Sequence, residues 1–136
     1  MSVKPLRVGI VGAGGIAIHQ HVPSYQRCAD TRVVAVCDVS EDALEAMRQQ
    51  FDIPKTYADY REMLGDEELD IISVCTSNDM HHPVVMAAIE RGIDIYCEKP
   101  LALTHAQAVE MYLAARAREL KTGVNFGHRR TPAAQL

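Results

Sequence analysis

A glycine-rich segment near the N-terminus has the residue types and the spacing that phosphate binding requires. Gly12, Gly14 and Ala17 form a GxGxxA pattern directly after an apolar run. In that context Gly12 makes a tight turn, Gly14 lets the backbone approach a pyrophosphate, and Ala17 permits close helix–strand packing. The free amides at the start of the following helix bind the phosphates. Because glycine turns also occur for purely structural reasons, the pattern predicts a dinucleotide site only in this strand–turn–helix setting.

An acidic residue stands where the adenosine ribose of such a dinucleotide would be bound. Asp38 ends the second apolar run, 21 residues after Ala17. A carboxylate at that place accepts hydrogen bonds from ribose hydroxyls and repels a 2′-phosphate. Neither Val39 nor Ser40 supplies a compensating arginine, so we predict NAD as the cofactor and NADP as less favoured. A methyltransferase with a GxGxG loop is the competing interpretation, but its third glycine would fall at position 16, which is Ile.

Two further polar clusters follow apolar runs later in the chain. Residues 76–82, taken alone, would be a solvated loop with a histidine cap before a helix. Glu98-Lys99-Pro100, taken alone, would be a strand-end ion pair and a turn. Placed beside a nicotinamide, however, Lys99 could lower the pKa of a reacting hydroxyl or polarise a carbonyl.

The elements that must position these clusters follow from an alternation of short apolar runs with amphipathic stretches. The expected strands are residues 6–11, 32–37, 55–57, 70–75, 94–97 and 122–126. Strands apolar on both faces predict a parallel sheet covered by helices on each side, and right-handed crossovers make it a doubly wound, Rossmann-type α/β fold. Such sheets bind ligands at the carboxyl ends of their strands, which here carry the polar clusters 12–17, 38–40, 76–81 and 98–100.

Local signals set the expected helix boundaries. Pro23 ends or kinks the first helix, which starts at about Gly15. Pro83 stands in the first turn of a later helix that Gly92 ends. N-caps are expected at Ser40, Asp59 and Thr104. One face of the last helix is expected to be lined by Ala106, Val109, Leu113, Ala117 and Leu120.

The composition is that of an ordinary globular protein of one domain, residues 1–136. The chain is 48% hydrophobic and 24% charged, which excludes disordered, collagenous and low-complexity proteins. Its longest apolar runs, of about six residues, are too short for a membrane span. The N-terminus lacks the apolar stretch of a secretory signal. We therefore expect a cytoplasmic protein that has no membrane partner.

Charge and side-chain spacing restrict the partners further. The net charge of −4 argues against nucleic acid, and the basic residues near the C-terminus do not alternate with aromatic ones as a stacking platform would require. The four cysteines lack zinc-type spacing and are expected to be small buried side chains in a reducing compartment. His19 and His21 face different sides of a helix, so no metal is predicted, and a capping or packing role is favoured for His21.

Taken together, these clusters resemble the glucose-fructose oxidoreductase, inositol dehydrogenase and rhizopine-catabolism oxidoreductase (Gfo/Idh/MocA) family. The resemblance covers the whole chain through Gly-x-Gly-Gly-Ile-Ala, Asp38, Thr-x-Asn-x-x-His at 76–81, Glu-Lys-Pro at 98–100 and Arg129-x-x-Pro132. It implies an NAD-dependent dehydrogenase that moves a hydride between nicotinamide and a secondary alcohol or carbonyl. Sugars, cyclitols and related small molecules are the implied substrates.

The resemblance also implies a role for each matching residue. Lys99 would be the catalytic residue, beside nicotinamide and substrate, and the Lys99–Pro100 peptide bond would be cis. Relatives often have proline where this chain has Ser77, which changes the stiffness of the loop. The residues implied to bind the cofactor are Gly12, Gly14, Gly15, Ile16, Asp38, Thr76, Ser77, Asn78, His81, Glu98, Lys99 and Arg129.

Members of that family usually carry a second α/β domain, which forms the substrate pocket. Residues from about 122 would lead towards that domain, which is absent from this chain. We therefore expect residues 1–136 to bind NAD without appreciable turnover, and the full-length form to be a homo-oligomer. Two alternatives remain open: a non-enzymatic dinucleotide-binding or regulatory module of the same family, and a partner-binding remnant whose glycine loop has no ligand.

Overall fold

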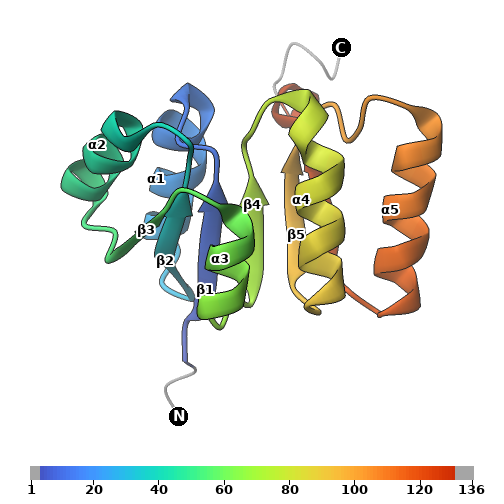
Figure 1. The fold of residues 1–136 in the computed structure, drawn as a ribbon, viewed down its shortest axis with the longest axis horizontal. Helices are drawn as coiled ribbons and strands as arrows, with labels where there is room; N and C mark the ends of the chain where they lie inside the picture. The colour runs from blue at the N-terminus through green and yellow to red at the C-terminus, as the bar shows by residue number, and fades with distance from the viewer. Residues whose placement is uncertain (1–3, 131–136) are drawn as a thin grey trace.

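A six-stranded, all-parallel sheet forms the centre of the fold in the computed structural model, which describes residues 4–130 (Figure 1). Its strands are β1 (Leu6–Val11), β2 (Thr31–Cys37), β3 (Lys55–Tyr57), β4 (Ile71–Val74), β5 (Asp94–Glu98) and β6 (Thr122–Asn125). Each lies within one residue of the predicted bounds. The strand order β3-β2-β1-β4-β5-β6 confirms the doubly wound, Rossmann-type fold. The order reverses between β1 and β4, and doubly wound sheets bind ligands at the carboxyl ends of such a strand pair.

Helices cover both faces of this sheet (Figure 1). Their bounds are η1, a π-helical turn (Ala17–His21), α1 (Val22–Arg27), α2 (Glu41–Phe51), α3 (Tyr60–Asp66), α4 (Asn78–Glu90), α5 (His105–Ala117) and η2, a 3₁₀ turn (Gly127–Arg130). On one face α3, α4 and α5 share a hydrophobic core with β1, β2, β4 and β5. On the other face α1 and α2 pack in a second core with β1 and β2. Beyond that second core, the same face of β4, β5 and β6 borders a hollow of about 570 Å³.

The predicted helix caps are present. Backbone N–H groups donate to the capping side chains from Ala43 to Ser40, from Arg61 to Asp59, and from Gln107 to Thr104. Each cap satisfies one of the orphan amides of a first helical turn. Gly92 follows α4 with a φ of 73°, a left-handed conformation that glycine adopts at little cost. The short-range signals in the sequence therefore predict these helix ends correctly.

The first helix does not end at Pro23. Helical residues run from Gly15 to Arg27, and the register changes one turn before the proline, where the Val22 N–H bonds to the Ala17 carbonyl across five residues. This wider turn places Pro23 in the first turn of α1, where a missing N–H is tolerated. The irregularity that accompanies the proline is thus a π-helical turn directly before it.

The expectation that Pro83 stands in the first turn of its helix is wrong. α4 begins five residues earlier, at Asn78, with Ser77 as its N-cap residue and Pro83 inside the helix. The polar residues before the proline resemble a loop in the sequence. They suit a first helical turn because an acidic side chain such as Asp79 is favourable near the positive end of the helix dipole.

The last helix buries a different face from the apolar one that the sequence indicates. Met111 and Ala115 are buried, whereas Val109 and Leu113 are 38% and 55% exposed. α5 carries alanine and larger apolar residues on several sides, so periodicity alone cannot select the side that meets the sheet. In the structure the side of α5 that carries Met111 and Ala115 packs into the hydrophobic core.

The cysteines are all unpaired, and three of them, Cys37, Cys75 and Cys97, are buried as predicted. Cys28 departs from the prediction because it is exposed, just after α1. Within residues 4–130, no helix has both the length and the apolar character that crossing a membrane would require.

Candidate functional site

The glycine turn after β1 lies tightly against the segment that follows β4. Gly12 has a φ of 98°, and a Cβ atom at this position would lie only 2.5 Å from the Cys75 carbonyl oxygen and 2.9 Å from the Thr76 nitrogen. The Gly12 N–H donates to the Cys37 carbonyl at 2.8 Å. Only glycine fits both this backbone conformation and this approach. Gly12 thus joins the ends of three strands, β1, β2 and β4.

The next residues of the turn are open to solvent. Gly14 is exposed, and a Cβ placed on it would meet no atom within 4 Å. The first hydrogen bond of the following helix runs from the Ile18 N–H to the Gly14 carbonyl. The amides of Gly15 and Ile16 therefore precede the helical hydrogen-bond pattern, as phosphate-binding amides do. Ala17 is fully buried, which allows the close packing that the pattern predicts.

Asp38 holds the turns after β1 and β2 together. Its Oδ2 accepts a hydrogen bond from the Ala13 N–H at 2.7 Å, and its Oδ1 accepts one from the Ser40 N–H at 2.9 Å. An ionised carboxylate has about four acceptor sites. Two backbone bonds therefore orient Asp38 and leave acceptor capacity for hydroxyl groups of a ligand.

These residues border a groove of about 510 Å³ at the carboxyl edge of the sheet, here called the glycine-turn groove. It is lined by Val11, Gly12, Gly14, Cys37, Asp38, Val39, Ala58, Asp59, Tyr60, Arg61, Cys75, Thr76, Ser77 and Met80. Five predicted cofactor residues, namely Gly12, Gly14, Asp38, Thr76 and Ser77, thus meet around one cavity. Asn78 is exposed in the first turn of α4, next to this lining.

His81 has a different position from the other residues of its motif. Its side chain is fully buried. Its Nδ1 lies 2.7 Å from the Pro100 carbonyl oxygen, and its Nε2 lies 3.2 Å from the Thr76 carbonyl oxygen. In this structure His81 joins the start of α4 to the segment after β5 and contacts backbone on both sides.

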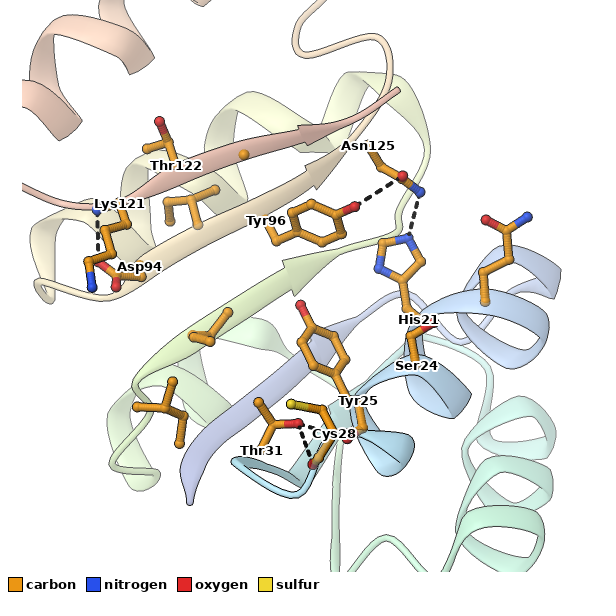
Figure 2. A pocket seen from close by; sticks show the side chains of 15 residues that line it. His21, Ser24, Tyr25, Cys28, Thr31, Asp94, Tyr96, Lys121, Thr122 and Asn125 are labelled. Carbon is orange, nitrogen blue, oxygen red and sulfur yellow. Dashed lines mark hydrogen bonds between the residues drawn. The ribbon is translucent and has the colours of Figure 1, made fainter. Parts of the chain in front are cut away.

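Glu98 lies in a polar group, the Glu98 cluster, in which His21, Ser73 and Glu98 are buried and Tyr96 and Asn125 are half-buried. Glu98 Oε1 lies 2.7 Å from His21 Nε2 and accepts a hydrogen bond from Asn125 Nδ2 at 2.5 Å. Figure 2 shows His21, Asn125 and Tyr96 converging above the hollow on the sheet face. Burial raises the pKa of Glu98, but the hydrogen bonds from His21 and Asn125 outweigh it, so the pKa lies below its ordinary value. The carboxylate is therefore held in its charged form.

Lys99 and Arg129 are exposed near this cluster. The Lys99–Pro100 peptide bond is cis, as predicted. The Lys99 N–H donates to Glu98 Oε2 at 3.3 Å, and the Lys99 side chain faces solvent. The Arg129 guanidinium lies 5.2 Å above the Phe126 ring and borders a hollow of about 340 Å³ that Tyr96 and Asn125 also line.

Several groove residues were missed in the sequence. Tyr60 and Arg61 line the glycine-turn groove, with the Arg61 guanidinium 4.6 Å from the Tyr60 ring centroid. Their signal was their position after β3, a strand beside β2, so that their segment opens on the same edge as Asp38. Ser73 also had a signal, because it is a polar residue inside the apolar run of β4.

Among residues 4–130, no three His, Cys, Asp or Glu side chains are grouped in a way that could hold a metal ion.

Comparison with known proteins gives a consistent result. Residues 6–126 match the model of the oxidoreductase family GFO_IDH_MocA, described as an NAD-binding Rossmann fold. The chain is 36% identical over 129 residues to D-glucoside 3-dehydrogenase of Escherichia coli K12, covering 95% of this chain and 37% of that protein. It is 29% identical over 124 residues to myo-inositol 2-dehydrogenase of Thermotoga maritima, covering 91% of this chain and 37% of that protein.

A solved structure extends the comparison to the fold. The WlbA dehydrogenase of Chromobacterium violaceum, in complex with NADH and UDP-GlcNAcA, superposes with a TM-score of 0.91 at 26% identity. The match covers 99% of this chain and 39% of that one. The chain thus spans somewhat more than a third of the length of the relatives that it matches.

Proposed function

The chain belongs to the GFO_IDH_MocA oxidoreductase family and matches its NAD-binding Rossmann domain, and on that premise we propose that it is the cofactor domain of an NAD-dependent dehydrogenase. The reaction we propose moves a hydride between nicotinamide and a secondary alcohol or carbonyl of a sugar, cyclitol or related molecule. Support for this substrate class comes from relatives whose names are glucoside and inositol dehydrogenases.

One observation carries the proposal: the 2.7 Å hydrogen bond from the Ala13 N–H to Asp38 Oδ2. It fixes a carboxylate beside an open glycine turn whose first helical amides are free for phosphate. A pyrophosphate fits at Gly14, where a Cβ would meet nothing, and a ribose fits at Asp38, whose oxygens keep acceptor capacity. The residues present therefore suit a dinucleotide.

Each part of the chain then has a distinct task in the proposed reaction. NAD, when bound, supplies the hydride acceptor. Gly14, Gly15 and Ile16 bind phosphate through backbone amides, and Asp38 orients the adenosine ribose. Thr76, Ser77 and Asn78 contact the cofactor further along. His81 supports that segment from the protein interior, through its contacts with the backbone carbonyls of Thr76 and Pro100. Lys99 holds or moves a proton at the reacting oxygen of the substrate, and Arg129 closes the same end of the site.

Titration of the purified chain with NADH, followed by fluorescence and calorimetry, tests cofactor binding. We expect saturable binding with one site per chain, and a chain without it would contradict the proposal. The assay of turnover is separate: NADH absorbance is followed with a panel of sugars and cyclitols. We expect no appreciable turnover by this chain, because Lys99 is exposed and substrate positioning accounts for about 7–11 kcal/mol of barrier lowering. Turnover that is lost in Lys99→Ala would contradict that expectation.

The cellular setting is part of the same proposal. We propose a cytoplasmic location, which three buried, unpaired cysteines support because thiols stay reduced there. A small-molecule partner and no nucleic acid suit the net charge of −4. A homo-oligomer in the full-length form is proposed from the family resemblance. Sedimentation of the full-length protein would test the oligomer.

A further inference from the structure

His21 is a buried histidine far in sequence from every other polar group that it contacts. It stands at the end of the π-helical turn η1, and only 3% of it is exposed. Its Nδ1 lies 2.7 Å from Ser73 Oγ on β4, and its Nε2 lies 2.7 Å from Glu98 Oε1 on β5. These partners are 52 and 77 residues away along the chain. Both ring nitrogens are therefore engaged inside the protein.

The contacts define the orientation of the ring and of the carboxylate. An ionised carboxylate only accepts hydrogen bonds, so His21 Nε2 carries the proton that it shares with Glu98. Asn125 Nδ2 donates to the same oxygen, and the Asn125 Oδ1 accepts from the Tyr96 hydroxyl at 3.0 Å. The other oxygen of Glu98 accepts from the Lys99 N–H. Glu98 is thereby held at both oxygens, with His21 on one side and the Lys99 backbone on the other.

The wider turn of η1 supports this placement. A π-helical turn shifts the residues that follow it relative to a regular helix, and such turns occur frequently at functional sites. Here the turn begins at Ala17, directly after the open amides of the glycine turn, and it ends at His21. One short helical segment therefore leads from the glycine turn to the Glu98 cluster.

We infer that His21 is a positioning residue for the nicotinamide end of the site: it orients the Glu98 carboxylate and, through it, the backbone of Lys99. This inference rests on the proposed function, because it assumes that the nicotinamide half of NAD lies at Glu98 and Lys99. In this role His21 acts through Glu98 and not by its own contact with cofactor or substrate. Loss of its ring leaves a buried carboxylate with fewer donors and frees the segment after β5 to move.

Binding of two ligands separates this role from a general effect on folding. NADH carries the nicotinamide ring, whereas ADP-ribose has the same adenosine, pyrophosphate and second ribose without that ring. We expect His21→Ala to weaken NADH binding about tenfold, the effect of losing one hydrogen bond to a charged group, and to leave ADP-ribose binding within about twofold. Calorimetric titration of both ligands into the full chain measures the two dissociation constants. An unchanged ratio between them would overturn the inference.

Matched variants keep the test decisive if His21→Ala does not fold. His21→Gln keeps a donor for Glu98, so NADH affinity should be partly retained. Ser73→Ala removes the second partner of the ring, and NADH binding should weaken by a smaller factor in the same direction. His19→Ala, an exposed position two residues earlier on η1, should change neither constant. If His19→Ala reproduces the effect of the His21 variants, the loss of NADH affinity comes from a general disturbance of the helix, and the inference is wrong.

A double variant tests the route through Glu98. In a Glu98→Ala background, where the acceptor of the His21 hydrogen bond is gone, the change His21→Ala should add little to the loss of NADH affinity, because both changes remove the same hydrogen bond. Additive losses of NADH affinity would show that His21 does not act through Glu98. A wild-type chain that binds neither ligand would instead contradict the proposed function, and the inference would fall with it.

Discussion

The glycine-turn groove and the Glu98 cluster are built in different ways. In the groove, Gly12 and Asp38 act through backbone conformation and backbone amides, over the short segments 12–14 and 38–40. In the Glu98 cluster, side chains from η1, β4, β5 and β6 meet in the interior, and the most distant pair, His21 and Asn125, is 104 residues apart. In the first region each segment carries its own short motif, and backbone contacts join these segments at the ends of β1, β2 and β4. The second exists only when four elements are packed together, so changes to the two regions should have different consequences.

The largest effect is expected for Gly12→Ala. The added Cβ would lie 2.5 Å from the Cys75 carbonyl oxygen, and the φ of 98° is unfavourable for alanine. Strain of this kind alone costs about 1–3 kcal/mol, and the overlap with backbone adds to it. We expect a clear loss of stability in urea denaturation together with a loss of NADH binding.

Gly14→Ala is the matched control, because its Cβ meets no protein atom within 4 Å. This variant should unfold nearly as the wild type does and still bind NADH more weakly, because the methyl group faces the place proposed for the pyrophosphate. Equal stability losses in the two glycine variants would mean that the groove is not built around Gly12.

A smaller effect, on cofactor choice, is expected for Asp38→Ser. The carboxylate places a negative charge where a 2′-phosphate would sit, and Arg61 lines the same groove. Removal of the charge should therefore shift the NAD-to-NADP preference by about 1–3 kcal/mol towards NADP. Parallel titrations with NADH and NADPH measure the shift, and Arg61→Ala in the same background should reverse part of it. A wild-type chain that binds NADPH as tightly as NADH would refute the role of Asp38.

The Glu98 cluster should show itself in the pH dependence of stability. The folded pKa of Glu98 lies below the ordinary value of 4.5. The charge of Glu98 therefore stabilises the fold above the pKa that this residue has in the unfolded chain. This stabilisation is lost as the pH falls through the lower pKa that it has in the folded chain. In urea denaturation across pH 3–7, Glu98→Gln should lower stability at neutral pH, and its difference from wild type should shrink as the pH falls below about 4.5. A constant difference across that range would mean that Glu98 is not held in its charged form.

The smallest effect is expected for Tyr96→Phe. This variant removes the hydroxyl that donates to Asn125 Oδ1 at 3.0 Å and leaves the half-buried ring in place. Loss of one such bond costs about 0.5–1.5 kcal/mol of stability. NADH affinity should stay within about twofold of wild type, the value expected when Asn125 still donates to Glu98. A larger loss of affinity would extend the set of positioning residues to Tyr96.

The contrast between the two regions also explains what the sequence could predict. Strand bounds and N-caps depend on a few adjacent residues, and the Gly12 turn is marked by its own glycine motif; all of these predictions are confirmed. The predicted start of α4 is wrong because Pro83 is a strong local signal for a first helical turn, whereas the polar residues from Asn78 onwards resemble a loop in the sequence. The buried face of α5 differs from the predicted one because several sides of that helix are apolar and only tertiary packing selects one.

The Glu98 cluster needed the three-dimensional structure. Spacing along the chain does not relate His21 to Glu98, because the strand order that brings η1 to the end of β5 is a property of the whole sheet. The sequence therefore favoured a capping or packing role for His21, and its hydrogen bonds to Ser73 and Glu98 came from the structure. Ser73 within an apolar strand and Glu98 in its Glu-Lys-Pro motif are the local signs of this cluster, and neither of them names His21 as a partner.

The unequal exposure of the cysteines makes the protein suitable for site-selective labelling. Burial raises the pKa of Cys37, Cys75 and Cys97 to about 12, so their thiolates are scarce near neutral pH. Cys28 is exposed and lines the hollow beside Tyr25 and Thr31 (Figure 2). A maleimide fluorophore should therefore attach at one position without mutagenesis. The dye would report, through its emission, any molecule or protein segment that covers this face of the sheet.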